Sequence, residues 1–148
     1  MYKEHIPVSD LDLPESLSAS SPLVVAKKYL DFSFIRPLTT SVYTHKMGRP
    51  NIDPVLICKV VFLSLLENKS FRKVTRELDY NPEYAWFLDI TLQEKFLNHS
   101  SLSRHLLRLK KAQLLVPTLT NLENQARELN IIDPETDFLR LISIKDFA

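Results

Sequence analysis

The sequence predicts an all-α protein, and three observations support this prediction. Only one glycine, Gly48, occurs in 148 residues, whereas β-hairpins and phosphate-binding loops need several glycines. Leucine-rich segments carry apolar residues at helical spacing, and prolines directly follow capping residues at the starts of several of them, as is typical of helix N-termini. The composition, 45% hydrophobic and 25% charged, is that of a globular domain with a sizeable core. We therefore predict a compact multi-helix domain with a helix-turn-helix-like core.

The first elements are predicted to be an arm and a helix. Residues 1–22 are rich in Ser, Pro and Asp and are expected to form a flexible, extended arm. The dipeptide Ser21-Pro22 has the order of a capping residue and a first helical residue, so a helix is expected to begin there. Proline does not continue a helix easily, and we expect this helix to end before Pro37.

A connecting loop over residues 39–52 is predicted to lead into the next helix. Gly48 supplies backbone freedom in this loop, and Pro50 stiffens its exit. Asp53 and Pro54 then repeat the order of an N-cap followed by proline at the first helical position. The sequence thus predicts a helix that begins immediately after this dipeptide.

This helix, over residues 55–66, is predicted to be the central core helix. It exposes only Lys59 and Ser64 and is apolar elsewhere. Its 12 residues are too few to span a bilayer, so we expect no membrane association. Cys58 is the single cysteine, which excludes an internal disulfide and a multi-cysteine zinc site, and its apolar surroundings predict a buried thiol.

The second half of the chain is predicted to add further helices. Capping residues are expected at Ser70, at Asn81, and at either Ser100 or Ser101. Residues 91–100 are expected to form a loop or a single turn, and residues 136–148 alternate enough for a strand or a ragged end. The expected helices cover residues 71–80, 82–90, 102–115 and 118–129.

Charge is distributed unevenly along the chain. The formal net charge is +1, but residues 27–111 hold 15 Lys and Arg against 8 Asp and Glu. Residues 1–26 and 112–148 each carry an excess of three negative charges. A basic middle between acidic ends indicates an anionic partner for the middle of the chain.

Two basic segments are the candidate binding site. Cations surround the expected helix start at Ser70, where the helix dipole favours acids, and residues 99–111 hold four Lys and Arg, two His and no acid. Phosphate groups bound at these helix N-termini would make the arrangement favourable; the alternative is a solvated basic face. The candidate DNA-binding residues are Lys69, Arg72, Lys73, Arg76, Ser101, Ser103, Arg104, His105, Arg108, Lys110 and Lys111.

Four motifs follow one another in a familiar order: DFSFIRPL, then GRPNIDP with the apolar segment and SFRK, then NPEYAWFLDI, then HSSLSRHLLRL. Over about residues 25–111 the chain resembles the N-terminal domain of bacterial insertion-sequence transposases of the DDE class (the InsH type). The resemblance implies a helical module that helps a transposase bind the terminal DNA of its element. Arg72 and Arg104 match arginines of the family pattern, whereas Asp89 replaces its usual glycine.

The resemblance also carries expectations about partners and location. It implies double-stranded DNA at transposon ends as the partner, with a homo-oligomer or full-length transposase as a second one. It further implies a location in the bacterial cytoplasm at the nucleoid. No cofactor or metal is expected, because the four histidines lack metal-ligand spacing. The expected domains are an arm (1–22), a DNA-binding domain (23–112) and a C-terminal helix with a truncated tail (113–148).

Family members of this type continue into an RNase-H-like catalytic domain, whose carboxylates hold two metal ions. Only 37 residues follow Lys111, whereas such a domain needs on the order of 100 residues or more. We therefore expect a truncated transposase, one reading frame of a split one, or a fragment, without catalytic residues and not itself an enzyme. Asp146 or Asp133 is a candidate remnant of the first catalytic aspartate; the alternative is an ordinary C-terminal end.

Two further patterns leave alternatives open. Apolar residues recur every four and three positions from Leu115 to Leu129, which fits either a partner helix or the protein's own core. Packing against a partner helix would make the chain a protein-interaction or dimerisation module that regulates a full-length transposase. Tyr84, Trp86 and Phe87 fit either base stacking or core packing, and their position between two helices favours the core.

Overall fold

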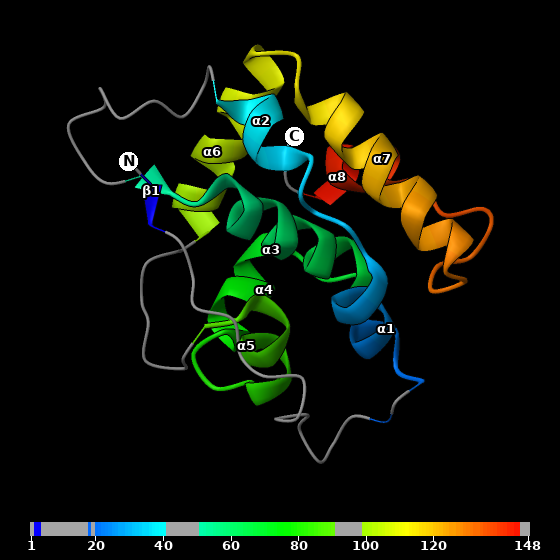
Figure 1. The fold of residues 1–148 in the computed structure, drawn as a ribbon. Coiled ribbons are helices and arrows are strands. Elements are labelled where there is room, and N and C mark those ends of the chain that lie inside the picture. Colours follow the sequence, from blue (N-terminus) through cyan, green and yellow to red (C-terminus); the bar gives the residue numbers. More distant parts are fainter. Residues whose placement is uncertain (1, 4–17, 19, 41–50, 91–98, 146–148) are drawn as a thin grey trace.

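The computed structural model describes residues 2–3, 18, 20–40, 51–90 and 99–145, and confirms the all-α prediction (Figure 1). Within these residues, two short strands, β1 (Tyr2–Lys3) and β2 (Asn51–Ile52), pair in parallel with Tyr2 opposite Asn51. The helices are α1 (Pro22–Tyr29), α2 (Ile35–Thr39), α3 (Pro54–Glu67), α4 (Phe71–Glu77), α5 (Pro82–Leu88), α6 (His99–Lys111), α7 (Leu115–Glu128) and α8 (Phe138–Lys145).

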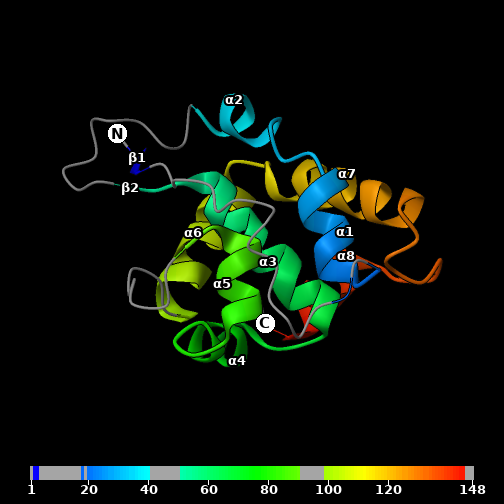
Figure 2. The ribbon, with the colours of Figure 1, turned by 60° about the horizontal axis from the view of Figure 1, so that its bottom comes forward.

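Helix α3 is the central helix, as predicted. The side chain of Asp53 caps it by accepting a hydrogen bond from the Val55 backbone N–H at 2.9 Å, and Pro54 begins it. Nearly every residue of α3 is buried, and α2, α4, α5 and α8 all contact it. Figure 2 shows α3 running through the middle of the other helices. Burial raises the pKa of the Cys58 thiol in this helix to about 12.

The prediction that α3 exposes Lys59 and Ser64 is wrong. Ser64 is 1% exposed, and its hydroxyl donates to the backbone carbonyl of Lys69 in the turn that ends the helix. Lys59 is partly buried and lies 3.7 Å from a carboxylate oxygen of Asp89. Both polar groups can be buried because each has a partner in another part of the chain.

The helix expected to run from Ser21 to just before Pro37 is instead two helices. The chain becomes extended at Leu30, and the Asp31 carboxylate then accepts a hydrogen bond from the Ser33 N–H at 2.8 Å. This break lets Phe32 turn onto α3, where its ring meets that of Phe62 edge-on at 6.1 Å. Pro37 lies inside α2, in its first turn, where a missing N–H costs no hydrogen bond.

Helices α4, α5 and α6 begin or end at other residues than expected. Ser70 and Asn81 cap α4 and α5 as predicted, with Asn81 accepting from two backbone N–H groups. Helix α4 ends at Glu77 and α5 ends at Leu88, both earlier than predicted. The predicted cap at Ser100 or Ser101 is wrong, because α6 already begins at His99 and both serines lie within its first turn.

The C-terminal segment is helical, so the predicted strand or ragged end is wrong for the described residues. The Phe138 N–H at the start of α8 donates to the Glu123 carboxylate of α7 at 2.6 Å, which satisfies a free donor of the new helix. Phe138 and Ile142, one turn apart, are buried against the core. Helix α8 contacts both α7 and α3.

The apolar residues of α7 pack within the chain. Leu115, Leu119, Leu122 and Ala126 are all buried, and α6 and α8 contact this helix. The interpretation of this pattern as packing on the protein's own core is therefore confirmed, and this stripe is not available to a partner helix.

Several predictions lie outside the described residues. They concern most of the arm (residues 1, 4–17 and 19), Gly48, Pro50, the part of the 91–100 loop over residues 91–98, and Asp146. No helix in the part of the chain that the structure describes is long and apolar enough to cross a membrane.

Candidate nucleic-acid interface

The two basic segments identified in the sequence form adjoining helices. Helix α4 contacts α6, and each turns an apolar face inward, with Phe71 and Val74 of α4 and three leucines of α6 buried. The outward faces carry cations. Exposed side chains are Arg72, Lys73 and Arg76 on α4, and Arg104, Lys110 and Lys111 on α6.

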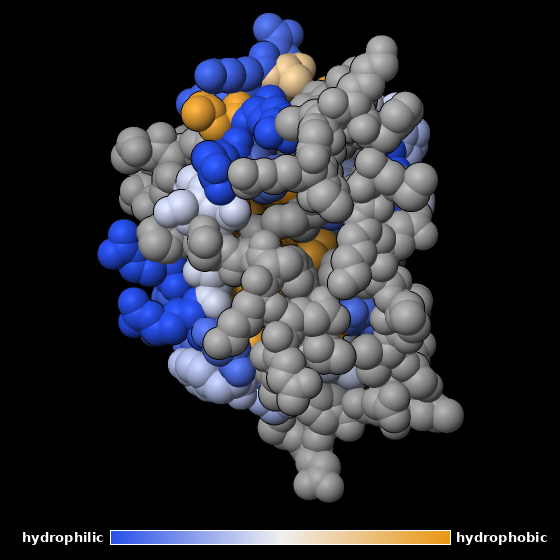
Figure 3. Space-filling view, turned by 90° about the vertical axis from the view of Figure 1, so that its left-hand side faces the viewer, coloured by the Kyte–Doolittle hydropathy of each residue, from blue (hydrophilic) through white to orange (hydrophobic). Residues whose placement is uncertain are grey.

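The acidic side chains near these cations are few. Helix α6 contains none in its 13 residues. Glu77 of α4 is bound to Lys69 at 2.9 Å and is only 14% exposed as a side chain. Figure 3 views the molecule from the left-hand side of Figure 1, where α6 lies. In this view the most hydrophilic side chains lie at the top and along the left edge of the molecule. The combined outward surface of α4 and α6 therefore has a positive charge excess.

Lys69 is held by internal partners. Its amine donates to the Glu77 carboxylate at 2.9 Å and to the Tyr84 hydroxyl at 2.6 Å, and lies over the ring of Tyr84. The hydrogen bond with Tyr84 is the main reason why the pKa of Lys69 is raised, and burial raises the pKa of Tyr84 to about 12. This arrangement joins the turn before α4 to α5.

Serines at the starts of α4 and α6 take part in hydrogen bonds within the protein. Ser70 Oγ accepts a hydrogen bond from the Lys73 N–H at 3.1 Å, so this donor of α4 is already satisfied. Ser101 Oγ accepts from Arg104 Nη2 at 3.1 Å. Ser101 thus orients a guanidinium on the outer surface of α6. Ser103 is half-buried on the same helix.

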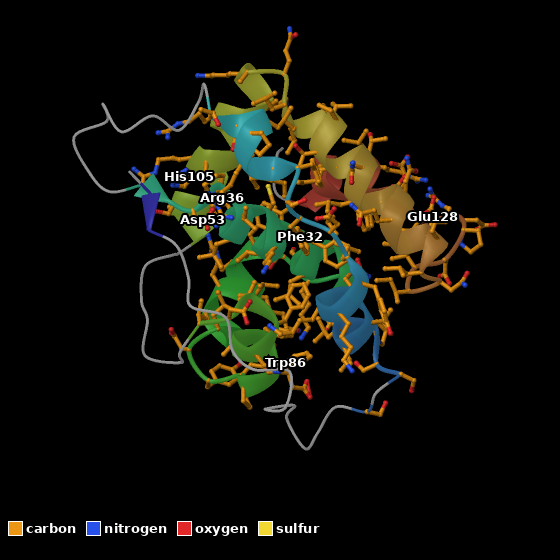
Figure 4. All side chains as sticks on the ribbon, in the orientation of Figure 1. Phe32, Arg36, Asp53, Trp86, His105 and Glu128 are labelled. Atoms are coloured by element: carbon orange, nitrogen blue, oxygen red, sulfur yellow. The ribbon has the colours of Figure 1, made fainter. Side chains whose placement is uncertain are left out.

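His105 and Arg108 lie at the edge of this surface and are half-buried. Burial lowers the pKa of His105 to about 4, and the positive charges of Arg108 and Arg104 act in the same direction. A neutral imidazole adds no charge to the surface at neutral pH. Figure 4 shows where His105 lies on α6.

We expect the ring of His105 to titrate near pH 4 in the folded chain, well below the usual value of about 6.5. As the pH falls, the unfolded chain binds this proton at a higher pH than the folded chain does. The contribution of the neutral His105 to stability is therefore fully present above about pH 6.5 and is lost as the pH falls toward the folded pKa. An NMR titration of the imidazole protons measures the midpoint, and His105→Gln should reduce this part of the pH dependence. A midpoint near 6.5 would contradict the burial of this ring.

Tyr84, Trp86 and Phe87 are core residues, 1%, 4% and 1% exposed. Their interpretation as packing residues is confirmed, and they are not accessible for base stacking. Figure 4 shows Trp86 on α5 and the Arg36–Asp53 pair, which joins α2 to the start of α3. Sequence reasoning missed this ion pair, because its partners are 17 residues apart in the chain.

The carboxylates outside the basic surface form no metal site in the described part of the chain. No group of three His, Cys, Asp or Glu is placed there to hold an ion. Asp133 is exposed and lines a shallow cavity between the end of α3 and the start of α8, together with Glu135 and Asp137.

These features define a class: an all-helical domain with two adjoining helices that carry exposed cations. A family model described as "Transposase domain (DUF772)" matches residues 11–108, about two thirds of the chain. The chain belongs to this transposase domain family, which indicates a role in transposition. No curated protein and no solved structure matches the chain.

Proposed function

We propose that this chain binds double-stranded DNA at the ends of an insertion sequence, as the N-terminal part of a transposase of the DDE class and the InsH type. The proposed contact surface is the outward face of α4 and α6. The role assigned to the chain is DNA recognition, and no strand cleavage or joining is assigned to it.

The observation that carries this proposal is the contact between α4 and α6. This contact brings two separate basic segments of the sequence side by side, and six of their cations are exposed. DNA binding depends mainly on cations that neutralise phosphates along the duplex. Membership of a transposase domain family makes DNA the anionic partner with the clearest role.

We narrow the set of proposed contact residues by the exposure and the hydrogen-bond partners of each side chain. Lys73, Arg76 and Lys111 are exposed and are suited to contact phosphates, and Arg104 is exposed beside them. Lys69 has its amine occupied by Glu77 and Tyr84, and we propose that it positions α4 and does not contact DNA.

The double substitution Lys73→Ala/Lys111→Ala, one change on each helix, should weaken binding to a short random-sequence duplex. Each lost phosphate contact lowers the slope of log affinity against log salt concentration by about 0.9, so the slope should fall by about 1.8. Fluorescence anisotropy between about 50 and 200 mM salt measures both quantities.

A matched control removes the same charge elsewhere. Lys28 of α1 and Arg140 of α8 are exposed and lie outside α4 and α6. Lys28→Ala/Arg140→Ala should leave the salt slope near the wild-type value. Equal losses in both double variants would show that net charge, not this surface, determines binding. A wild-type chain that binds no duplex at the lowest salt concentration would contradict the proposed function itself.

A further inference from the structure

The outward face of α6 carries a regular row of side chains. Ser100, Arg104, Leu107 and Lys111 follow at intervals of four, three and four residues, so they lie on one face of the helix. All four are exposed. The row lies opposite the buried leucines of the same helix, Leu102, Leu106 and Leu109. We refer to Ser100, Arg104, Leu107 and Lys111 as the outer row.

Leu107 is the unexpected member of the outer row. It is 43% exposed, whereas the other leucines of α6 are at most 1% exposed. Arg104 lies one turn before it and Lys111 one turn after it, so cations flank this apolar side chain on both sides. Protein–protein interfaces are depleted of lysine and serine, which form the two ends of the outer row, so a protein partner fits this pattern less well.

A DNA major groove matches the outer row better. The rise of about 1.5 Å per residue places Ser100 and Lys111 about 16 Å apart, and the major groove is about 12 Å wide. Residues at the ends of the row then lie near the phosphates, while the central residues face the base edges. The major groove offers one apolar group, the C5-methyl of thymine, and guanine offers two acceptors suited to arginine.

We propose that α6 is the recognition helix and that Leu107 contacts the methyl group of a thymine in the preferred DNA site. Arg104, oriented by its 3.1 Å hydrogen bond to Ser101 Oγ, reads a neighbouring base edge. This inference rests on the proposed DNA-binding function and adds to it the helix and the residue that provide sequence preference.

The test begins with selection of preferred duplexes from a random pool by the full chain. Each thymine of the selected site is then replaced by deoxyuridine, which lacks only the methyl group. At one position, this replacement should weaken wild-type binding about fourfold, the loss expected for one buried methyl-sized group. Leu107→Ala should bind the two duplexes equally and keep the wild-type salt slope.

The matched control is Val116→Ala, which shortens another exposed apolar side chain, 55% exposed and on α7. It should still distinguish thymine from deoxyuridine. If Leu107→Ala also distinguishes them, or if no thymine is sensitive in the wild type, the inference is wrong while salt-dependent binding leaves the proposed function intact. If Leu107→Ala changes only the oligomeric state, seen by light scattering, Leu107 belongs to an interface between copies and the inference is equally wrong.

Discussion

Replacing Phe62 with alanine is expected to destabilise the protein by about 3–5 kcal/mol. Phe62 is 0% exposed in the middle of α3. Its ring lies 6.1 Å from Phe32, 6.3 Å from Phe87 and 5.8 Å from Phe138, measured between centroids. These partners come from the α1–α2 connection, α5 and α8, so one cavity would weaken the attachment of three elements to α3.

A loss of this size is a large fraction of the roughly 5–15 kcal/mol that stabilises a typical domain. Urea denaturation followed by circular dichroism measures the midpoint and the free energy of unfolding. Tyr80→Ala provides the control, because Tyr80 is an aromatic residue that is 63% exposed. If the two variants had the same midpoint, Phe62 would not be at the centre of the core.

The second large effect is expected at Asp89, where three elements meet. Its carboxylate lies 2.5 Å from the amine of Lys27 in α1 and 3.7 Å from that of Lys59 in α3. Lys27 also donates to the Trp86 carbonyl at 2.7 Å, and its side chain is 8% exposed. Asp89 directly follows α5 and has a left-handed backbone with φ of 58°, a conformation that glycine adopts without strain.

Asp89→Ala should destabilise the protein by about 3–5 kcal/mol, because the buried amine of Lys27 loses its counter-charge. The left-handed backbone also disfavours alanine, by about 1–2 kcal/mol. Asp89→Gly removes the same charge without this backbone cost and should therefore be less harmful than Asp89→Ala. Thermal or urea denaturation of both variants separates the two contributions.

A third variant tests the electrostatic part. In Lys27→Met/Asp89→Gly neither charge of the closest pair remains, so the double variant should be more stable than the sum of its single substitutions predicts. Strict additivity of the two losses would show that the carboxylate and the Lys27 amine do not interact appreciably.

Local signals in the sequence predicted much of the fold. Asp53, Ser70 and Asn81 cap their helices with side-chain hydrogen bonds, as their residue types and the neighbouring residues predicted. The apolar run after Pro54 is the central helix. These features depend on residues within one or two turns of each other, so the sequence carries them directly.

Predictions failed where distant residues decide the outcome. The segment around Phe32 leaves the helical conformation because its ring packs on Phe62 of α3. The segment from Phe138 was predicted to be a strand or a ragged end, yet it is a helix whose start is bonded to Glu123 and whose apolar residues cover the core. Neither partner lies near enough in the sequence to be recognised from local spacing.

For the candidate site, the residue types alone show which segments are basic and that residues 99–111 contain no acid. Only the tertiary structure placed α4 against α6, and only it distinguished the outward Arg104 from the internally bound Lys69. Charge is a property of composition and is visible along the chain. The direction and partners of each charged side chain depend on how the helices pack, because packing decides which face is desolvated and which remains in water.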